Sequence, residues 1–268
     1  MEAIPANKLL RSHPDTLQVV RNEINLAKPG EMKAAVKILK EWVQQQPHFK
    51  KKDFSDHMLE NTIVVGKGSM ERAKRQIDKV CTMRNLWPHF FAIEDIRTEC
   101  AETIEDGCIA VMPNLNKEHH RVLVVKAGNS TMTSQKLLQH YKFGVCDCFG
   151  LRLKGIHLVS ESKLIDTLIG ILKQFLKPKL ISRLHHYSDV DQLAKAVGEE
   201  YLPQDVGGTE RCARDIQEDW LTELSSKSNL EYMRMMREAT IDESLRPKGD
   251  FSQEYAGMPG TFRLLTVD

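Results

Sequence analysis

The chain has 268 residues, 41% of them hydrophobic and 28% charged, which suits one large globular domain or one domain with a small appendage. Thirty-eight basic residues against thirty-seven acidic ones give a formal charge of +1, so no overall field draws the chain to nucleic acid or to an anionic membrane. No stretch approaches the ~18 apolar residues of a membrane span, and the start lacks a signal-peptide core, so we expect a cytoplasmic protein.

The first part of the chain shows helical periodicity. Residues 31–46 predict an amphipathic helix that Pro47 ends. A second helix is predicted from Ser69, a suitable N-cap with Glu71 in the first turn, to the residue before Pro88. The apolar stripes of these two helices are Ala35, Ile38, Leu39 and Trp42, and Ala73, Ile77, Val80 and Leu86.

The sequence IVVGKGSMERAKRQ, residues 63–76, has the look of a phosphate-binding loop. Such a loop needs a glycine five residues before the Gly-Lys pair and a hydroxyl after the lysine, because backbone amides wrap the phosphates and the hydroxyl holds magnesium. Asn61 and Gly68 stand at these positions instead. The stretch is therefore interpreted as a bend between two helices.

The pattern then changes to short β-rich runs. Residues 107–112, 121–126 and 151–159 are apolar runs bounded by turns. Strands that alternate with helices favour an α/β layer structure.

An apolar helix pattern, residues 160–176, is followed by a basic stretch. Residues 173–186 hold four basic side chains and no acidic one. Two interpretations stay open. The first is a helix that opens against an anionic membrane, and the second is a core helix followed by a solvated turn. Physical arguments alone favour the second. The four basic residues are Lys173, Lys177, Lys179 and Arg183.

Several motifs in residues 154–209 resemble the C-terminal half of the CRAL-TRIO lipid-binding domain. They are a strand ending in K-x-I-H, the Lys177-Pro178 pair, the R-x-H element at Arg183 and the L-P-x-x-x-G-G turn from Leu202. Residues 56–91 are similar to the small helical domain of that family, through E-x-A-K and M-R-x-x-x-P elements. The ending MPGTFRLLTVD is most similar to the insect α-tocopherol-transfer-protein-like branch.

This resemblance implies an α/β fold: an all-helical N-terminal module, then a lipid-binding domain with a mostly parallel sheet and a lid helix. The implied domains are residues 1–95, 96–245 with an internal shortening near 127–150, and a tail at 246–268. The lid would be residues 162–176, and its lipid-facing side chains Ile165, Leu168, Ile169, Leu172 and Phe175.

A phosphoinositide head group is implied at Arg152, Lys179 and Arg183, whose forked or flexible cations suit phosphate. A further basic position of the family falls on Gly66, with only Lys67 nearby. The family also has a helix, a strand and a second helix where this chain has only residues 127–150, room for one helix near 133–142 and a turn. Several dozen residues of the domain are therefore expected to be missing.

The expected function is binding and transfer of a hydrophobic lipid (a tocopherol, retinoid, carotenoid or phospholipid), with release during transient contact with phosphoinositide membranes. The alternative is a ligand-free adaptor that binds anionic lipid through its basic stretch. We expect no enzyme activity, cofactor, metal or nucleic-acid partner. Cys146, Cys148 and His140 have poor spacing for a metal, and the adjacent histidines at 119–120 and 185–186 point to opposite faces of their strands.

Overall fold

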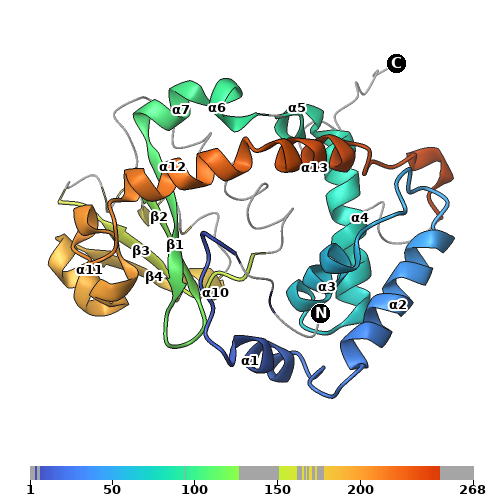
Figure 1. The fold of residues 1–268 in the computed structure, drawn as a ribbon, viewed down its shortest axis with the longest axis horizontal. Helices are drawn as coiled ribbons and strands as arrows, with labels where there is room; N and C mark the ends of the chain where they lie inside the picture. Colours follow the sequence, from blue (N-terminus) through green and yellow to red (C-terminus); the bar gives the residue numbers. More distant parts are fainter. Residues whose placement is uncertain are drawn as a thin grey trace.

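The computed structural model describes residues 4, 7–93, 95–126, 151–161, 165, 167, 169–170, 173 and 178–247. Helices α2 (Glu31–Gln45), α3 (Asp56–Val65) and α4 (Met70–Leu86) gather on one side of the molecule, and the strands lie on the other (Figure 1). Two consecutive helices, α12 (Ala213–Leu224) and α13 (Lys227–Arg237), run from the strands toward α4 and α5 (Pro88–Phe91). Among the described helices, none is long and apolar enough to cross a membrane.

Seven helices precede the strands, and their boundaries follow local sequence signals. Ser55 and Ser69 accept hydrogen bonds from the backbone amides of Met58 and Arg72, at 3.2 and 3.4 Å, and so cap the third and fourth helices. Pro88 occupies the first turn of the fifth. The helices are α1 (Thr16–Glu23), α2 (Glu31–Gln45), α3 (Asp56–Val65), α4 (Met70–Leu86), α5 (Pro88–Phe91), α6 (Ile96–Glu99) and α7 (Ala101–Asp106).

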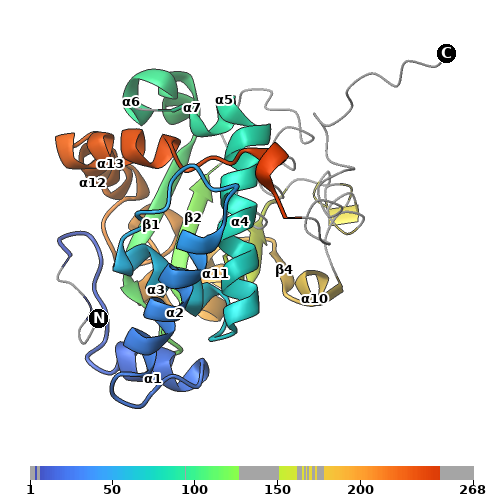
Figure 2. The same cartoon turned by 90° about the vertical axis from the view of Figure 1, so that its right-hand side faces the viewer.

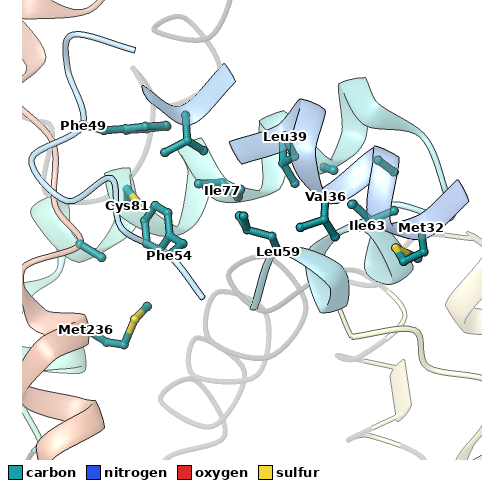
Figure 3. Packing of buried hydrophobic residues seen from close by; sticks show 14 of the residues in the cluster. Met32, Val36, Leu39, Phe49, Phe54, Leu59, Ile63, Ile77, Cys81 and Met236 are labelled. Carbon is teal, nitrogen blue, oxygen red and sulfur yellow. The ribbon is translucent and has the colours of Figure 1, made fainter. Parts of the chain in front are cut away.

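A hydrophobic core forms between α2, α3 and α4, with Leu39, Leu59, Ile63 and Ile77 at most 1% exposed (Figure 3). The predicted stripe of α2 needs one correction, because Ile38 is 52% exposed. The buried arc is centred on other residues, and at ~100° per residue Ile38 lies about 120° from its middle. That arc consists of Met32, Ala35, Val36, Leu39 and Val43.

The bend between α3 and α4 is confirmed as an interhelical turn. Lys67 and Gly68 both have positive φ, 57° and 74°. A Cβ at Gly68 would lie 2.2 Å from the carbonyl oxygen of Ile24, so the backbone of this turn packs directly on the residue that follows α1. The close approach leaves that side of the turn filled by protein.

Within the described residues, four strands form two separate pairs. β1 (Cys108–Leu115) and β2 (Arg121–Lys126) are antiparallel, and β3 (Ile156–Val159) and β4 (Leu184–Tyr187) are parallel. The predicted strand at 151–159 is thus regular only over its last four residues. The mixed α/β class with N-terminal helices and a parallel pair is confirmed.

The remaining helices cover the strands and lead back to the N-terminal module. α12 packs across β1 (Figures 1 and 2), and a second core joins β1 and β2 to α11 and α12. Asp189 caps α11 by accepting a hydrogen bond from the amide of Gln192 at 2.9 Å. The boundaries are α10 (Pro178–Ile181), α11 (Val190–Val197), η2 (Glu199–Tyr201), η3 (Gln204–Val206), α12 (Ala213–Leu224), α13 (Lys227–Arg237) and η4 (Glu243–Leu245).

Candidate functional site

The β1–β2 hairpin has one covered face and one exposed apolar face. Ile109 pairs with Val125 and Val111 with Leu123, and residues directly opposite in an antiparallel pair share a face. Ile109, Leu123 and Val125 are 52%, 51% and 58% exposed. Large aliphatic side chains grouped on one exposed face commonly mark a binding surface.

The opposite face of the hairpin is held by α12. Cys108, Ala110 and Met112 point into the second core. The outer edge of β1 is also bonded, because the amide of Ile109 donates to Gln217 Oε1 at 2.6 Å and Trp220 Nε1 donates to the carbonyl of Val111 at 3.0 Å. These bonds satisfy backbone groups that an edge strand would leave open and so hold the apolar face in place.

A basic segment precedes β3. Arg183 Nη1 donates to the carbonyl oxygen of Leu153, which places its guanidinium against the segment that contains Arg152 and Lys154. Both of these cations contact Glu23 at the end of α1: Arg152 Nη2 lies 3.5 Å from one carboxylate oxygen and Lys154 Nζ 3.6 Å from the other. The segment 152–154 therefore brings three cations together, its own Arg152 and Lys154 and the guanidinium of Arg183.

Helix α1, which carries Glu23 as its last residue, is fixed at both ends. Arg21 forms a buried ion pair with Glu60 of α3. At the other end of the helix, Thr16 Oγ1 lies 3.0 Å from Nδ1 of His119 in the turn between β1 and β2. α1 therefore joins the helical module to the hairpin.

A row of aromatic rings lies on one face of the parallel pair. His157 stacks on His185 with ring centroids 5.1 Å apart, and its Nδ1 lies 3.0 Å from the hydroxyl of Tyr187. Partial burial, and secondarily the neighbouring His185, lower the pKa of His157. His186 points to the other face, toward the carbonyl of Ser160 at 3.1 Å, as expected for adjacent strand residues.

The predicted lid falls largely outside the described residues. Ile165 and Ile169 are helical and partly buried. Leu168, Leu172 and Phe175 lie outside the described residues. The same holds for Cys146, Cys148 and His140.

The predicted head-group residues are only partly brought together. The Arg183 guanidinium lies beside the residue that follows Arg152. Lys179 is exposed on the short helix α10, and no side-chain contact relates it to the other two. Whether the three bind a phosphoinositide stays a prediction.

A small cavity of about 140 Å³ lies at the start of β1. It is lined by Asp106, Lys126, Asp205 and Arg214, and Lys126 Nζ is 2.7 Å from Asp205 Oδ2. Its polar lining suits neither a lipid nor an apolar ligand. Within the described part of the chain, no three histidine, cysteine or acidic side chains group as metal ligands would.

The region that contains the basic segment matches a known protein family. Residues 145–208 match the family described as the CRAL/TRIO domain. This part of the chain is similar to the CRAL-TRIO family. Residues 28–101 match a second family, described as a Pinta-like UBA domain, so the helical module and the CRAL-TRIO segment are matched separately.

The chain is similar to curated mammalian proteins. It is 36% identical over 64 residues to the α-tocopherol transfer protein-like proteins of Mus musculus and Homo sapiens, 24% of this chain and 19% of each relative. It is 34% identical over 67 residues to clavesin-1 of Rattus norvegicus, 25% of this chain and 19% of that protein. The matched part therefore spans about a fifth of the length of these relatives.

Two features of this site were missed by sequence reasoning. The apolar face of the hairpin was hidden because RVLVVK is a continuous apolar run, which predicts a strand buried on both faces. The contact of Glu23 with Arg152 and Lys154 joins positions about 130 residues apart, for which no local pattern exists.

Proposed function

We propose that this protein binds and transfers a hydrophobic lipid, in the cytoplasm, with transient attachment to membranes during release. The exposed apolar face of the β1–β2 hairpin carries the proposal, since a chain with a CRAL-TRIO segment presents Ile109, Leu123 and Val125 to solvent on a rigid sheet. The ligand class stays as expected from the sequence: a tocopherol, retinoid, carotenoid or phospholipid. No catalytic step is needed.

The energetics favour an apolar occupant. Full burial of an exposed aliphatic side chain contributes ~1.5–3 kcal/mol, so covering three half-exposed ones would contribute about 2–4 kcal/mol before the ligand's own surface is counted. The hairpin is already held by Gln217 and Trp220, so the protein loses little conformational entropy on binding. A preformed apolar surface is typical of small-molecule sites.

The basic segment supplies the proposed membrane contact. Arg183 donates to the backbone carbonyl of Leu153, the residue after Arg152, and Lys179 adds an exposed cation on α10. Guanidinium forks suit phosphate oxygens, and a membrane with phosphoinositides offers them at high density. The overall charge of +1 means that such attraction must come from this local group.

The test is native mass spectrometry of the cell-expressed full chain, followed by organic extraction and lipid identification. The wild-type protein is compared with a Leu123→Thr, Val125→Thr variant. Threonine is β-branched and suits a strand, so the variant keeps strand propensity while it loses apolar surface. The control is Ile38→Thr, which removes an equally exposed aliphatic side chain from α2. Circular dichroism confirms that each variant folds.

A stoichiometric lipid on the wild-type and control proteins, and its loss from the hairpin variant, is the expected result. Its extracted mass would give the ligand class. A folded wild-type protein without any extractable lipid would refute the carrier function. Equal lipid on all three proteins would move the site away from the hairpin.

The alternative is a ligand-free adaptor that binds anionic lipid or a protein. It is favoured by the separation of the described strands into two pairs, where a closed lipid pocket calls for a continuous floor. The same samples distinguish the two functions. An adaptor binds phosphoinositide vesicles while it carries no lipid.

A further inference from the structure

Glu23 lies at the end of α1 where a negative charge is unfavourable. It is the last residue of α1, where the helix dipole presents partial negative charge and a carboxylate is unfavourable. The two cations that it contacts, Arg152 and Lys154, come from the CRAL-TRIO segment. The helix itself therefore gives no reason for an acid at this position, while the basic segment does.

The carboxylate is also held in place. The next residue, Ile24, is 2% exposed and its carbonyl lies against Gly68, while Arg21 is anchored by Glu60. The backbone on both sides of Glu23 is therefore fixed in the helical module. Its side chain reaches the basic segment from a defined direction.

The contact is long and solvated. The N–O distances are 3.5 and 3.6 Å, and the side chains of Glu23, Arg152 and Lys154 are 47%, 26% and 41% exposed. Ion pairs of this kind are weak. A phosphate group, with more charge and three acceptor oxygens, makes stronger charge-assisted hydrogen bonds with the same cations.

We propose that Glu23 is an internal counter-anion that occupies the phosphate position at Arg152 and Lys154 until a phosphomonoester displaces it. Glu23 thereby sets an affinity threshold for binding at the two cations, which a phosphomonoester exceeds and a singly charged phosphodiester lipid does not. This inference rests on the proposed membrane function. The phosphate can come from a lipid head group or from a soluble phosphate.

The experiment measures binding of the full chain to vesicles of phosphatidylcholine with phosphatidylinositol 4,5-bisphosphate, and to vesicles with phosphatidylserine at equal surface charge. Wild-type protein is compared with Glu23→Gln, and with Glu41→Gln as the charge-matched control. Glu41 is exposed and forms a similarly loose pair with Lys37 at 3.9 Å on α2. Both substitutions remove one negative charge.

Glu23→Gln is expected to bind the phosphoinositide vesicles about two- to fivefold more tightly, the range that an exposed ion pair supports. It is also expected to bind the phosphatidylserine vesicles more tightly and so lose selectivity, while Glu41→Gln behaves as wild type. In a background of Arg152→Ala and Lys154→Ala, Glu23→Gln should give no gain. That coupling separates displacement at this site from a general charge effect.

The outcomes distinguish the inference from the function on which it rests. If the wild type binds phosphoinositide vesicles but Glu23→Gln and Glu41→Gln change affinity equally, the counter-anion is refuted and the membrane function stands. If neither wild type nor Glu23→Gln binds such vesicles, the membrane function fails. In that case soluble inositol trisphosphate and inorganic phosphate are titrated: binding that Glu23→Gln tightens supports the counter-anion with a soluble phosphate, and absence of binding refutes it.

Discussion

Arg246 donates hydrogen bonds from Nη1 to both carboxylate oxygens of Asp78, at 2.8 and 2.7 Å, across 168 residues of sequence. The two side chains are only 5% and 4% exposed. His48 Nε2 lies 3.0 Å from the same carboxylate, and Arg246 Nη2 donates to Thr82 Oγ1 at 2.8 Å. The segment after α13 is therefore fastened to α4 of the N-terminal module.

Replacing Arg246 with alanine should destabilise the protein by about 3–5 kcal/mol, because it leaves the buried carboxylate of Asp78 without its cation. Equilibrium unfolding in urea measures the change. The matched control is Arg211→Ala, which breaks an exposed ion pair with Asp219 and should cost less than about 1 kcal/mol. Equal effects of the two substitutions would show that the buried network contributes nothing beyond a surface pair.

The Asp78 network also predicts a pH dependence. Burial raises the pKa of Asp78, but hydrogen bonds from His48 and Arg246 together outweigh it, so the pKa is lowered from 3.8. A lowered native pKa contributes stability that is complete above pH 3.8 and is lost as the pH falls through the native value. The free energy of unfolding should therefore decrease below about pH 4. Thermal melts between neutral and acidic pH measure this decrease, and Asp78→Asn should weaken it; an unchanged acid profile would contradict the assignment.

Gly30 and Gly68 offer a matched pair of glycine-to-alanine substitutions. Gly30 and Gly68 both have positive φ, 84° and 74°, but a Cβ at Gly30 meets nothing within 4 Å while one at Gly68 would lie 2.2 Å from the Ile24 oxygen. Gly30→Ala should cost about 1–2 kcal/mol, the backbone penalty alone. Gly68→Ala should cost clearly more, because the clash is with backbone. Denaturant midpoints of the two variants measure the difference, and equal midpoints would mean that the turn moves freely away from α1.

Sequence reasoning reached the helical module with small errors. The helix that begins after Ser69 and ends before Pro88 follows from local capping and from the missing amide of proline, so its boundaries were predictable. The exposure of Ile38 was not, because the direction in which α2 faces depends on where α3 and α4 lie. The packing of Met236 and Ile241 into the N-terminal core likewise joins distant parts of the chain.

For the candidate site, the sequence by itself determined the kinds of residue present: the strand RVLVVK, the motifs of the CRAL-TRIO segment and the cations Arg152, Lys179 and Arg183. Composition and local periodicity fix these, because each depends on neighbours within a few residues. Only the tertiary structure decided that Ile109 and Leu123 share an exposed face and that Glu23 meets Arg152. Strand register, edge capping and long-range ion pairs arise when distant segments pack together, so no local pattern encodes them.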